Sequence, residues 1–179
     1  MYVIPKYKFA FFAAARTGSK AIAKALMEQR GAILIGSHHT TSDEHPDFEI
    51  GSDWTVCSAV RNHWDTLVSW WFKIERRAGA MTPLAEFIPR FCTNNPNFVQ
   101  GGRLWWKTLP HTNTILRYEH LQLDFDQVLV KVGMPPLDLP KVRDSLRAGA
   151  PYQIFYKRNM VEWVSQYFNT EIAKCGYKF

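Results

Sequence analysis

An apolar run that leads through one tight turn into a helical pattern is the feature that most limits the fold of this chain. Phe9–Leu26 reads FAFFAAARTGSKAIAKAL. The continuous apolar stretch at 8–13 is typical of a strand buried on both faces of a sheet. After Gly18, apolar residues recur at helical spacing until Gly31. The segment therefore predicts a strand, a short basic turn and a helix.

The rest of the chain continues this alternation. Further buried strands are expected at 32–36, 54–60 and 112–118. Further helices are expected from 62, and at 82–94, 98–109, 119–132, 140–147 and 158–174. The order predicts an α/β fold, a three-layer sandwich in which a mainly parallel sheet is covered on both faces. The length of 179 residues predicts a single domain, 1–179.

Composition limits the partners and the compartment. The net charge of +6 favours an anionic partner, which composition alone cannot identify as a nucleotide, a polyanion or a nucleic acid. The three cysteines form no CxxC pair, so a reduced, cytoplasmic location is expected. No apolar run approaches the roughly 20 residues of a membrane span, so a membrane partner is not expected.

The turn after the first strand has the chemistry of a phosphate site. Backbone N–H groups and the positive end of a helix dipole would face an anion there. The Walker pattern of ATPases and GTPases fails, because Ala13 replaces its first Gly and Ser19 follows Gly18 in place of Lys. On the turn alone, a phosphate site and a plain basic turn both remain possible. The residues of the turn are Arg16, Thr17, Gly18, Ser19 and Lys20.

A second segment, RNHWDTLVSWWF, begins where the strand at 54–60 is expected to end. Asn62 is a suitable N-cap, and Asp65 falls in the first helical turn, where the dipole favours an anion. Arg61 stands before the helix and Ser69 about two turns into it. A bound nucleotide could touch both side chains.

These two segments resemble the nucleotide-binding motifs of the PAPS-dependent sulfotransferases. ARTGSKA at 15–21 resembles the family's 5′-phosphosulfate loop, and RNHWDTLVSWW at 61–71 resembles its 3′-phosphate motif, with His63 where the family usually has Pro. The segments 101–121 and 160–179 resemble later parts of small bacterial and phage-type members, in the family's order.

The resemblance implies a P-loop-like sulfotransferase fold that moves a sulfuryl group from PAPS to an acceptor hydroxyl or amine and releases PAP. Arg16 and the backbone N–H groups of 17–20 would stabilise the leaving phosphate. A third contact to the 3′-phosphate is open among Arg103, Lys157 and Arg158. The implied cofactor-binding residues are Arg16, Thr17, Gly18, Ser19, Lys20, Arg61 and Ser69.

Transfer to a hydroxyl needs a general base, and His is the usual choice. The segment GSHHTT follows the strand at 32–36, and its match to the family's KHxT segment favours His39, with His38 second. The alternative is that one or both of them are solvated loop histidines. His45 extends the pattern toward a metal site, but adjacent histidines are awkward ligands for one ion, so no metal is expected. The fallback bases are Asp43, Glu44 and Glu49, whereas His63 is expected to be a helix-start residue.

Two other functions compete with sulfuryl transfer. A P-loop phosphotransferase would need a magnesium carboxylate at a strand end, and no apolar strand here ends in Asp. A non-catalytic protein that binds polyanions or nucleotides would fit the positive charge. The resemblance disfavours nucleic acid as a partner. The class of the acceptor and the oligomeric state cannot be read from the sequence, although the loops 36–53 and 76–100 are expected to shape the acceptor pocket.

Overall fold

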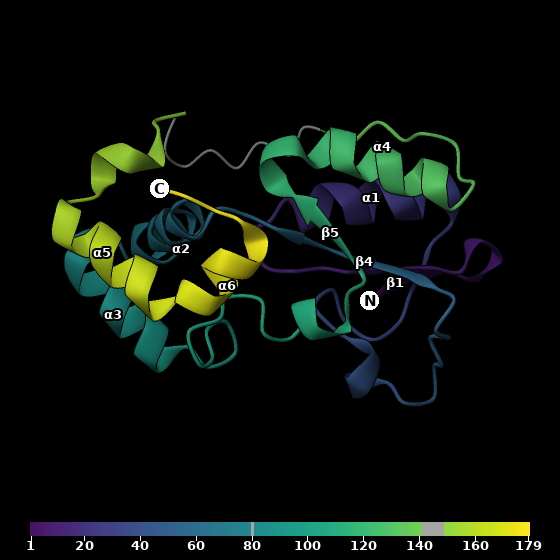
Figure 1. Cartoon of the computed structure of the whole chain (residues 1–179), viewed down its shortest axis with the longest axis horizontal. Helices are drawn as coiled ribbons and strands as arrows, with labels where there is room; N and C mark the ends of the chain where they lie inside the picture. Colours follow the sequence, from purple (N-terminus) through teal and green to yellow (C-terminus); the bar gives the residue numbers. More distant parts are fainter. Residues whose placement is uncertain (80, 141–148) are drawn as a thin grey trace. The chain divides into compact units, whose positions relative to one another are not determined.

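The computed structural model describes residues 1–79, 81–140 and 149–179, and it is an α/β protein with one mixed sheet (Figure 1). The chain divides into two compact units, each made of two stretches of sequence. Among the described residues, the first unit contains 1–60 and 107–140, and the second contains 61–106 and 149–179. The expectation of a single domain stays a prediction.

The first unit is built on a five-stranded sheet of strand order β3-β1-β2-β4-β5. Strands β2, β4 and β5 are parallel, whereas β1 runs antiparallel to both of its neighbours. The sheet is therefore mixed, and the expectation of a mainly parallel sheet is wrong. The strands are β1 (Tyr2–Ile4), β2 (Phe9–Phe12), β3 (Ile33–Leu34), β4 (Thr55–Val60) and β5 (Thr114–Arg117).

A short turn explains the antiparallel part of the sheet. The 3-10 turn η1 (Pro5–Tyr7) joins β1 to β2, with Lys8 in the left-handed conformation at φ 47°. Parallel strands need a crossover of a dozen or more residues, so a link this short forces an antiparallel pair. The strand expected at 32–36 is present as β3, but it is not buried. It is an edge strand whose Ile33 and Leu34 are 51% and 40% exposed.

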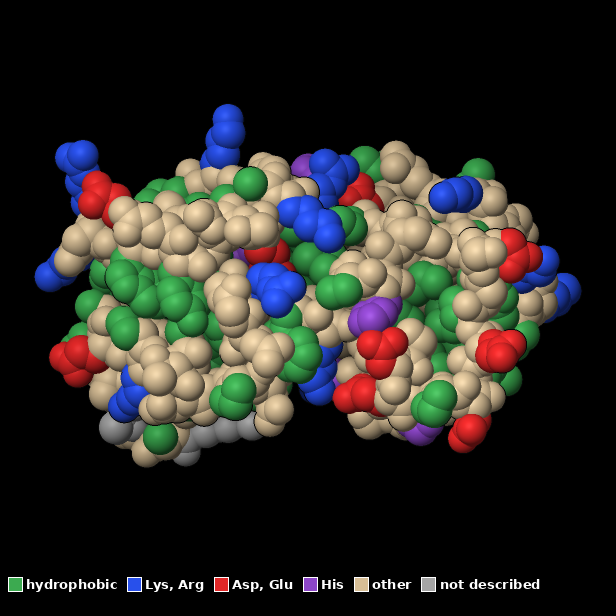
Figure 2. All heavy atoms as spheres, turned by 60° about the horizontal axis from the view of Figure 1, so that its bottom comes forward, with side chains coloured by type: hydrophobic (Ala, Val, Ile, Leu, Met, Phe, Trp, Pro, Cys, Tyr) green, Lys and Arg blue, Asp and Glu red, His purple; other side chains and the backbone are tan. Residues whose placement is uncertain are grey.

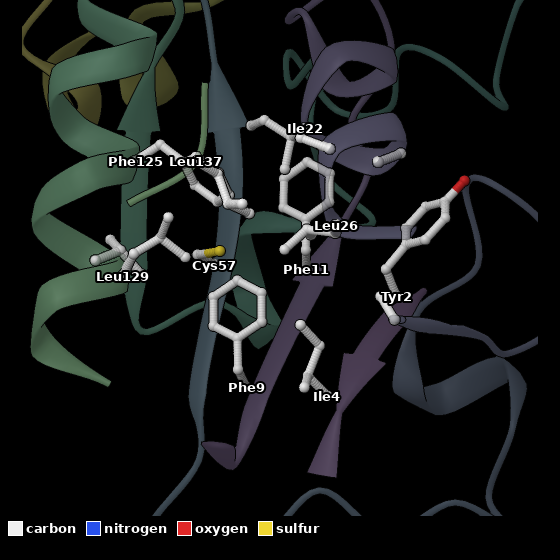
Figure 3. Packing of buried hydrophobic residues seen from close by; sticks show 14 of the residues in the cluster. Tyr2, Ile4, Phe9, Phe11, Ile22, Leu26, Cys57, Phe125, Leu129 and Leu137 are labelled. Carbon is white, nitrogen blue, oxygen red and sulfur yellow. The ribbon is translucent and has the colours of Figure 1, made fainter. Parts of the chain in front are cut away.

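Helices cover one face of this sheet. Helix α1 (Ser19–Arg30) and helix α4 (Leu121–Lys131) lie on the same side of the strands in Figure 1. Their apolar side chains pack with alternate residues of β1 and β2 in one continuous core. Figure 3 shows the rings of Phe9 and Phe11 in this core beside Leu26. The helix expected after the turn at 17–18 is thus confirmed, and Gly31 ends it.

A loop covers the other face within the first unit. The remaining side chains of β1 and β2, among them Val3 and Phe12, are buried there with Val56. The residues packed on them come from the segment 35–54, whose apolar members are Ile35, Phe48, Ile50 and Trp54. Within this unit the second covering layer is therefore a loop, where the three-layer expectation had helices.

The second unit is helical. Its aromatic side chains pack closely: the ring of Trp70 lies 5.4 Å from that of Phe91 and 4.4 Å from that of Phe98. The helices expected from 62 and at 82–94 are confirmed, and the one expected at 158–174 is divided at Phe168. The helices are α2 (His63–Ala78), α3 (Leu84–Asn94), α5 (Arg158–Tyr167) and α6 (Asn169–Cys175).

The helix expected at 98–109 is not formed. Gly101 and Gly102 take φ angles of 54° and 68° and turn the chain instead. A Cβ at Gly102 would lie 2.2 Å from the Tyr167 carbonyl oxygen, so the close approach of two backbones there requires glycine. The helix expected at 140–147 falls, beyond its first residue, outside the described residues. Further 3-10 turns are η2 (Ser42–Glu44), η3 (Leu109–His111), η4 (Tyr118–His120) and η5 (Tyr152–Phe155).

The described helices include none that is long and apolar enough to cross a membrane.

Gly18 should contribute more to stability than Gly31, although both are left-handed at the ends of α1. A Cβ at Gly18 would meet Leu121 Cδ2 at 2.8 Å and Tyr118 Cδ2 at 3.2 Å, whereas one at Gly31 would meet nothing within 4 Å. We expect Gly31→Ala to lower the free energy of unfolding by about 1 kcal/mol and Gly18→Ala by about 2–3 kcal/mol. Urea unfolding of the two variants measures the difference, and equal losses would contradict the crowding at Gly18.

Candidate functional site

The loop between β2 and α1 has a strained backbone. Arg16 takes φ 65° and Gly18 takes φ 77°, both in the left-handed region. For a residue other than glycine this conformation costs about 1–3 kcal/mol, and such residues cluster at functional sites. Thr17 is buried and its hydroxyl donates to the Ala14 carbonyl over 2.9 Å, which fixes the loop from inside.

The start of α1 is open to an anion. The N-cap residue of this helix is Gly18, which has no side chain to cap the first turn. Its leading backbone N–H groups and the positive end of its dipole are therefore available to a ligand. Ser19 begins the helix and is buried, while Lys20 follows it and is exposed. This is the arrangement that binds phosphate groups in other strand–loop–helix junctions.

His38 is a neutral imidazole with both ring nitrogens engaged. Burial, assisted by the charges of His39, Lys20 and the terminal amine, lowers the pKa of His38 to about 4. The Tyr2 hydroxyl lies 2.5 Å from Nδ1, and burial raises the pKa of this phenol, so it stays protonated in this hydrogen bond. Nε2 lies 3.3 Å from Ser19 Oγ, and the neutral ring donates through one of its nitrogens and accepts through the other.

His39 presents the opposite arrangement. Its Nδ1 lies 2.6 Å from the Ala13 carbonyl oxygen. A carbonyl can only accept, so Nδ1 carries the proton and Nε2 of the neutral ring holds a lone pair. Nε2 has no hydrogen-bond partner in the part of the chain that the structure describes, and the residue is exposed. An imidazole oriented by a backbone carbonyl in this way can accept a proton from a bound hydroxyl.

Ion pairs hold the loop that carries both histidines. Glu44 forms a capping box with Thr41 in η2, and its carboxylate lies 3.2 Å from Lys107 Nζ. Burial opposes ionisation, but the Thr41 N–H and Lys107 keep the pKa of Glu44 below its usual value. Asp43 lies 3.1 Å from His111 Nε2. Two of the three fallback bases are therefore engaged in fixing the loop, and Glu49 is an exposed carboxylate of the same loop.

Acidic side chains interrupt the positive charge of the first unit. On the face drawn in Figure 2, red acidic side chains stand among the blue basic ones. The loop at 43–53 alone carries five exposed carboxylates, a poor surface for a polyanion. They are Asp43, Glu44, Asp47, Glu49 and Asp53.

In the second unit, Arg61 and Asp65 form a buried ion pair at the start of α2. Arg61 Nε and one terminal nitrogen lie 2.8 and 2.7 Å from Asp65 Oδ2. The Asn62 side chain accepts the Asp65 backbone N–H, so the predicted N-cap is confirmed. Asp65, which was expected to interact with the dipole of this helix, thus also orients the guanidinium of Arg61. Ser69 is buried further along the same helix.

His63 has a structural role as the first residue of α2, as the sequence predicts. It is fully buried, and its Nε2 lies 3.0 Å from Glu171 Oε2. The same carboxylate accepts the backbone N–H groups of Leu104 and Trp105 over 2.7 and 3.1 Å. Glu171 therefore joins α2, α6 and the turn at 104–105 of this unit.

The three residues considered for a third 3′-phosphate contact also belong to the second unit, and all are exposed. Arg103 lies in the glycine turn, and Lys157 is the N-cap residue of α5. Arg158 Nε pairs with Glu162 over 3.0 Å on the surface of that helix.

The two units divide the predicted site residues. The first brings the loop residues 16–20 together with His38 and His39, and the second contains Arg61 and Ser69. Sequence reasoning missed Tyr2, because the antiparallel pairing of β1 that brings it to His38 was not predicted. No group of three or more His, Cys, Asp or Glu that could hold a metal ion occurs in the described ranges.

No protein-family model matches the chain, and no similar protein is found among curated sequences.

The neutral, half-buried side chain of His38 should make the free energy of unfolding fall in acid. The unfolded chain binds a proton on this residue near pH 6.5, whereas the folded chain resists until about pH 4. Stability that is complete above pH 6.5 is therefore lost as the pH falls toward 4. Between pH 7 and pH 4.5, the His38→Gln variant should lose about 1–2 kcal/mol less free energy of unfolding than the parent protein. The difference is no larger because His38 is partly exposed to solvent. Urea unfolding at both pH values tests this, and equal losses in the two proteins would refute it.

Proposed function

We propose that the chain is a PAPS-dependent sulfotransferase, which moves a sulfuryl group from PAPS to an acceptor hydroxyl or amine and releases PAP. One observation carries the proposal. The hydrogen bond from His39 Nδ1 to the Ala13 carbonyl leaves Nε2 able to accept a proton and ties the ring to the chain two residues before the segment 15–21, which resembles the 5′-phosphosulfate motif. The Ala13 backbone would then position both the base, through its carbonyl, and the donor loop, which follows it in the chain.

The chemistry follows from these residues. The acceptor oxygen attacks sulfur as the bond from sulfur to the 5′-phosphate oxygen breaks, and the acceptor's proton passes to His39 Nε2. Negative charge grows on the departing phosphate. Arg16 and the backbone N–H groups of 17–20 stabilise that charge at the open start of α1. Ser19 and Lys20 hold the same phosphate group.

The proposal assigns the 3′-phosphate to Arg61 and Ser69, on the strength of the resemblance of 61–71 to the family's second motif. The ion pair with Asp65 supports this assignment, because a guanidinium held in one orientation loses less entropy on binding a phosphate. This 3′ contact would distinguish PAPS from nucleotides without that group.

We also propose a P-loop-like architecture for the first unit. The parallel strands β2, β4 and β5, with α1 following β2 through the motif loop, support it. The antiparallel β1 and β3 would then be additions at one edge of that arrangement.

Binding of PAP tests the donor site. We expect isothermal titration to detect PAP binding, with 5′-AMP binding at least about tenfold more weakly because it lacks the 3′-phosphate. Ser69→Ala, which leaves the Arg61–Asp65 pair intact, should reduce this discrimination, and Arg16→Ala should weaken both ligands. Lys6→Ala, an exposed residue of η1, is the control. No binding at high micromolar PAP would exclude the proposed function.

The base is tested by turnover. With labelled PAPS and a simple phenol such as 4-nitrophenol as acceptor, we expect His39→Gln to lower the transfer rate by about 10²–10⁴-fold. Its affinity for PAP should stay within twofold of the parent, because the substitution removes no donor contact. His38→Gln is the matched comparison and should lose much less. If the two variants lose the same activity, His39 is not the base.

A further inference from the structure

A pocket of about 300 Å³ lies beside α1 in the first unit. Five residues of α1 between Lys20 and Glu28 line one side, and Tyr2 and His38 line the other. The volume is at the lower end of the range for small-molecule sites, so it suits a ligand of one ring. None of the sequence motifs discussed above includes the residues of α1 beyond Ala21.

The pocket offers an apolar surface to the body of a ligand. Ala23 and Met27 stand about one helical turn apart on α1, and Met27 is 45% exposed. Tyr2 is anchored in the core by its ring, while Figure 3 shows its oxygen pointing away from the packed cluster. The flat face of an aromatic or sugar ring could pack against these side chains.

The charges of the lining favour an anionic group. Lys20 and Lys24 are four residues apart, on one face of α1. Glu28 is the one carboxylate of the lining, and it lies 3.9 Å from Lys24 with both side chains more than half exposed. Pairs of this kind contribute little, so Lys24 can turn to a ligand at small cost. His38 adds no charge at neutral pH, since its pKa is about 4.

We infer that this pocket binds the acceptor, and that the acceptor is a small hydroxylated organic acid with one ring, held through its carboxylate or sulfate by Lys24. This inference rests on the proposed function. His38 lines the pocket, its ring centroid lies 4.5 Å from that of His39, and its Nε2 faces Ser19. An acid with its anionic end at Lys24 would point its hydroxyl toward His38, the neighbour of His39, and toward Lys20 of the donor loop.

The test compares acids with neutral molecules of the same shape. Isothermal titration with 4-hydroxybenzoate against 4-hydroxybenzamide, and with glucuronate against glucose, should show at least about tenfold tighter binding of one acid over its neutral partner. Lys24→Met, which keeps the apolar stem, should abolish the preference, and Glu28→Gln should strengthen it. Lys6→Met is the control and should leave it unchanged.

Measurement of PAP binding in the same variants separates this inference from the proposed function. We expect Lys24→Met to bind PAP like the parent, because Lys24 is outside the donor loop. If PAP binds but acids and neutral molecules bind alike, or if Lys24→Met keeps the preference, the pocket assignment is wrong and the donor site stands. Binding of acids without binding of PAP would overturn both the proposed function and the role of acceptor. A disaccharide with a terminal uronate that binds more tightly than glucuronate identifies a polysaccharide end as the source of the acid.

Discussion

The burial of β2 on both faces is the constraint on which the first unit depends. The four side chains of Phe9–Phe12 are at most 1% exposed, and alternate ones enter two different cores. Because the strand pairs with β1 on one side and β4 on the other, its backbone is also hydrogen-bonded to a neighbouring strand on each side. The strand ends at Phe12, and the loop that follows therefore starts from a fully buried, doubly paired segment. A strained backbone at Arg16 can persist only on such a support.

The two histidines show how hydrogen bonds divide chemical roles between adjacent residues. Both rings lie in one loop, yet one is hydrogen-bonded to a phenol and the other donates to a carbonyl. Both ring nitrogens of His38 have hydrogen-bond partners, whereas Nε2 of the exposed His39 has none among the described residues.

Local signals made part of this structure predictable. The strand β2, helix α1 and the Asn62 cap of α2 follow from apolar periodicity, a terminal glycine and an amide at the right position. The antiparallel strand β1 was not predictable from such signals, because a strand of three residues shows almost no periodicity. The turn that begins at Pro5 also lies within a largely apolar stretch and was not recognised as a turn. Glu171 was not predictable either, because its partners lie about 66 to 108 residues away and leave no local pattern. Within the candidate site, residue types were readable from the sequence, but the protonation of each imidazole depends on tertiary contacts.

The position of Tyr2 makes the site sensitive to strand register. Tyr2 faces Phe11 on β2 and Leu34 on β3, and its hydroxyl reaches His38 from β1, which lies between these two strands. Side chains alternate between faces, so a slip of β1 by one residue would carry this phenol to the opposite side. With only two residues in β3, the register must be fixed mainly by the tight turn at Pro5–Tyr7. The three-residue turn Pro5–Tyr7 thus helps to decide whether His38 has its phenol partner.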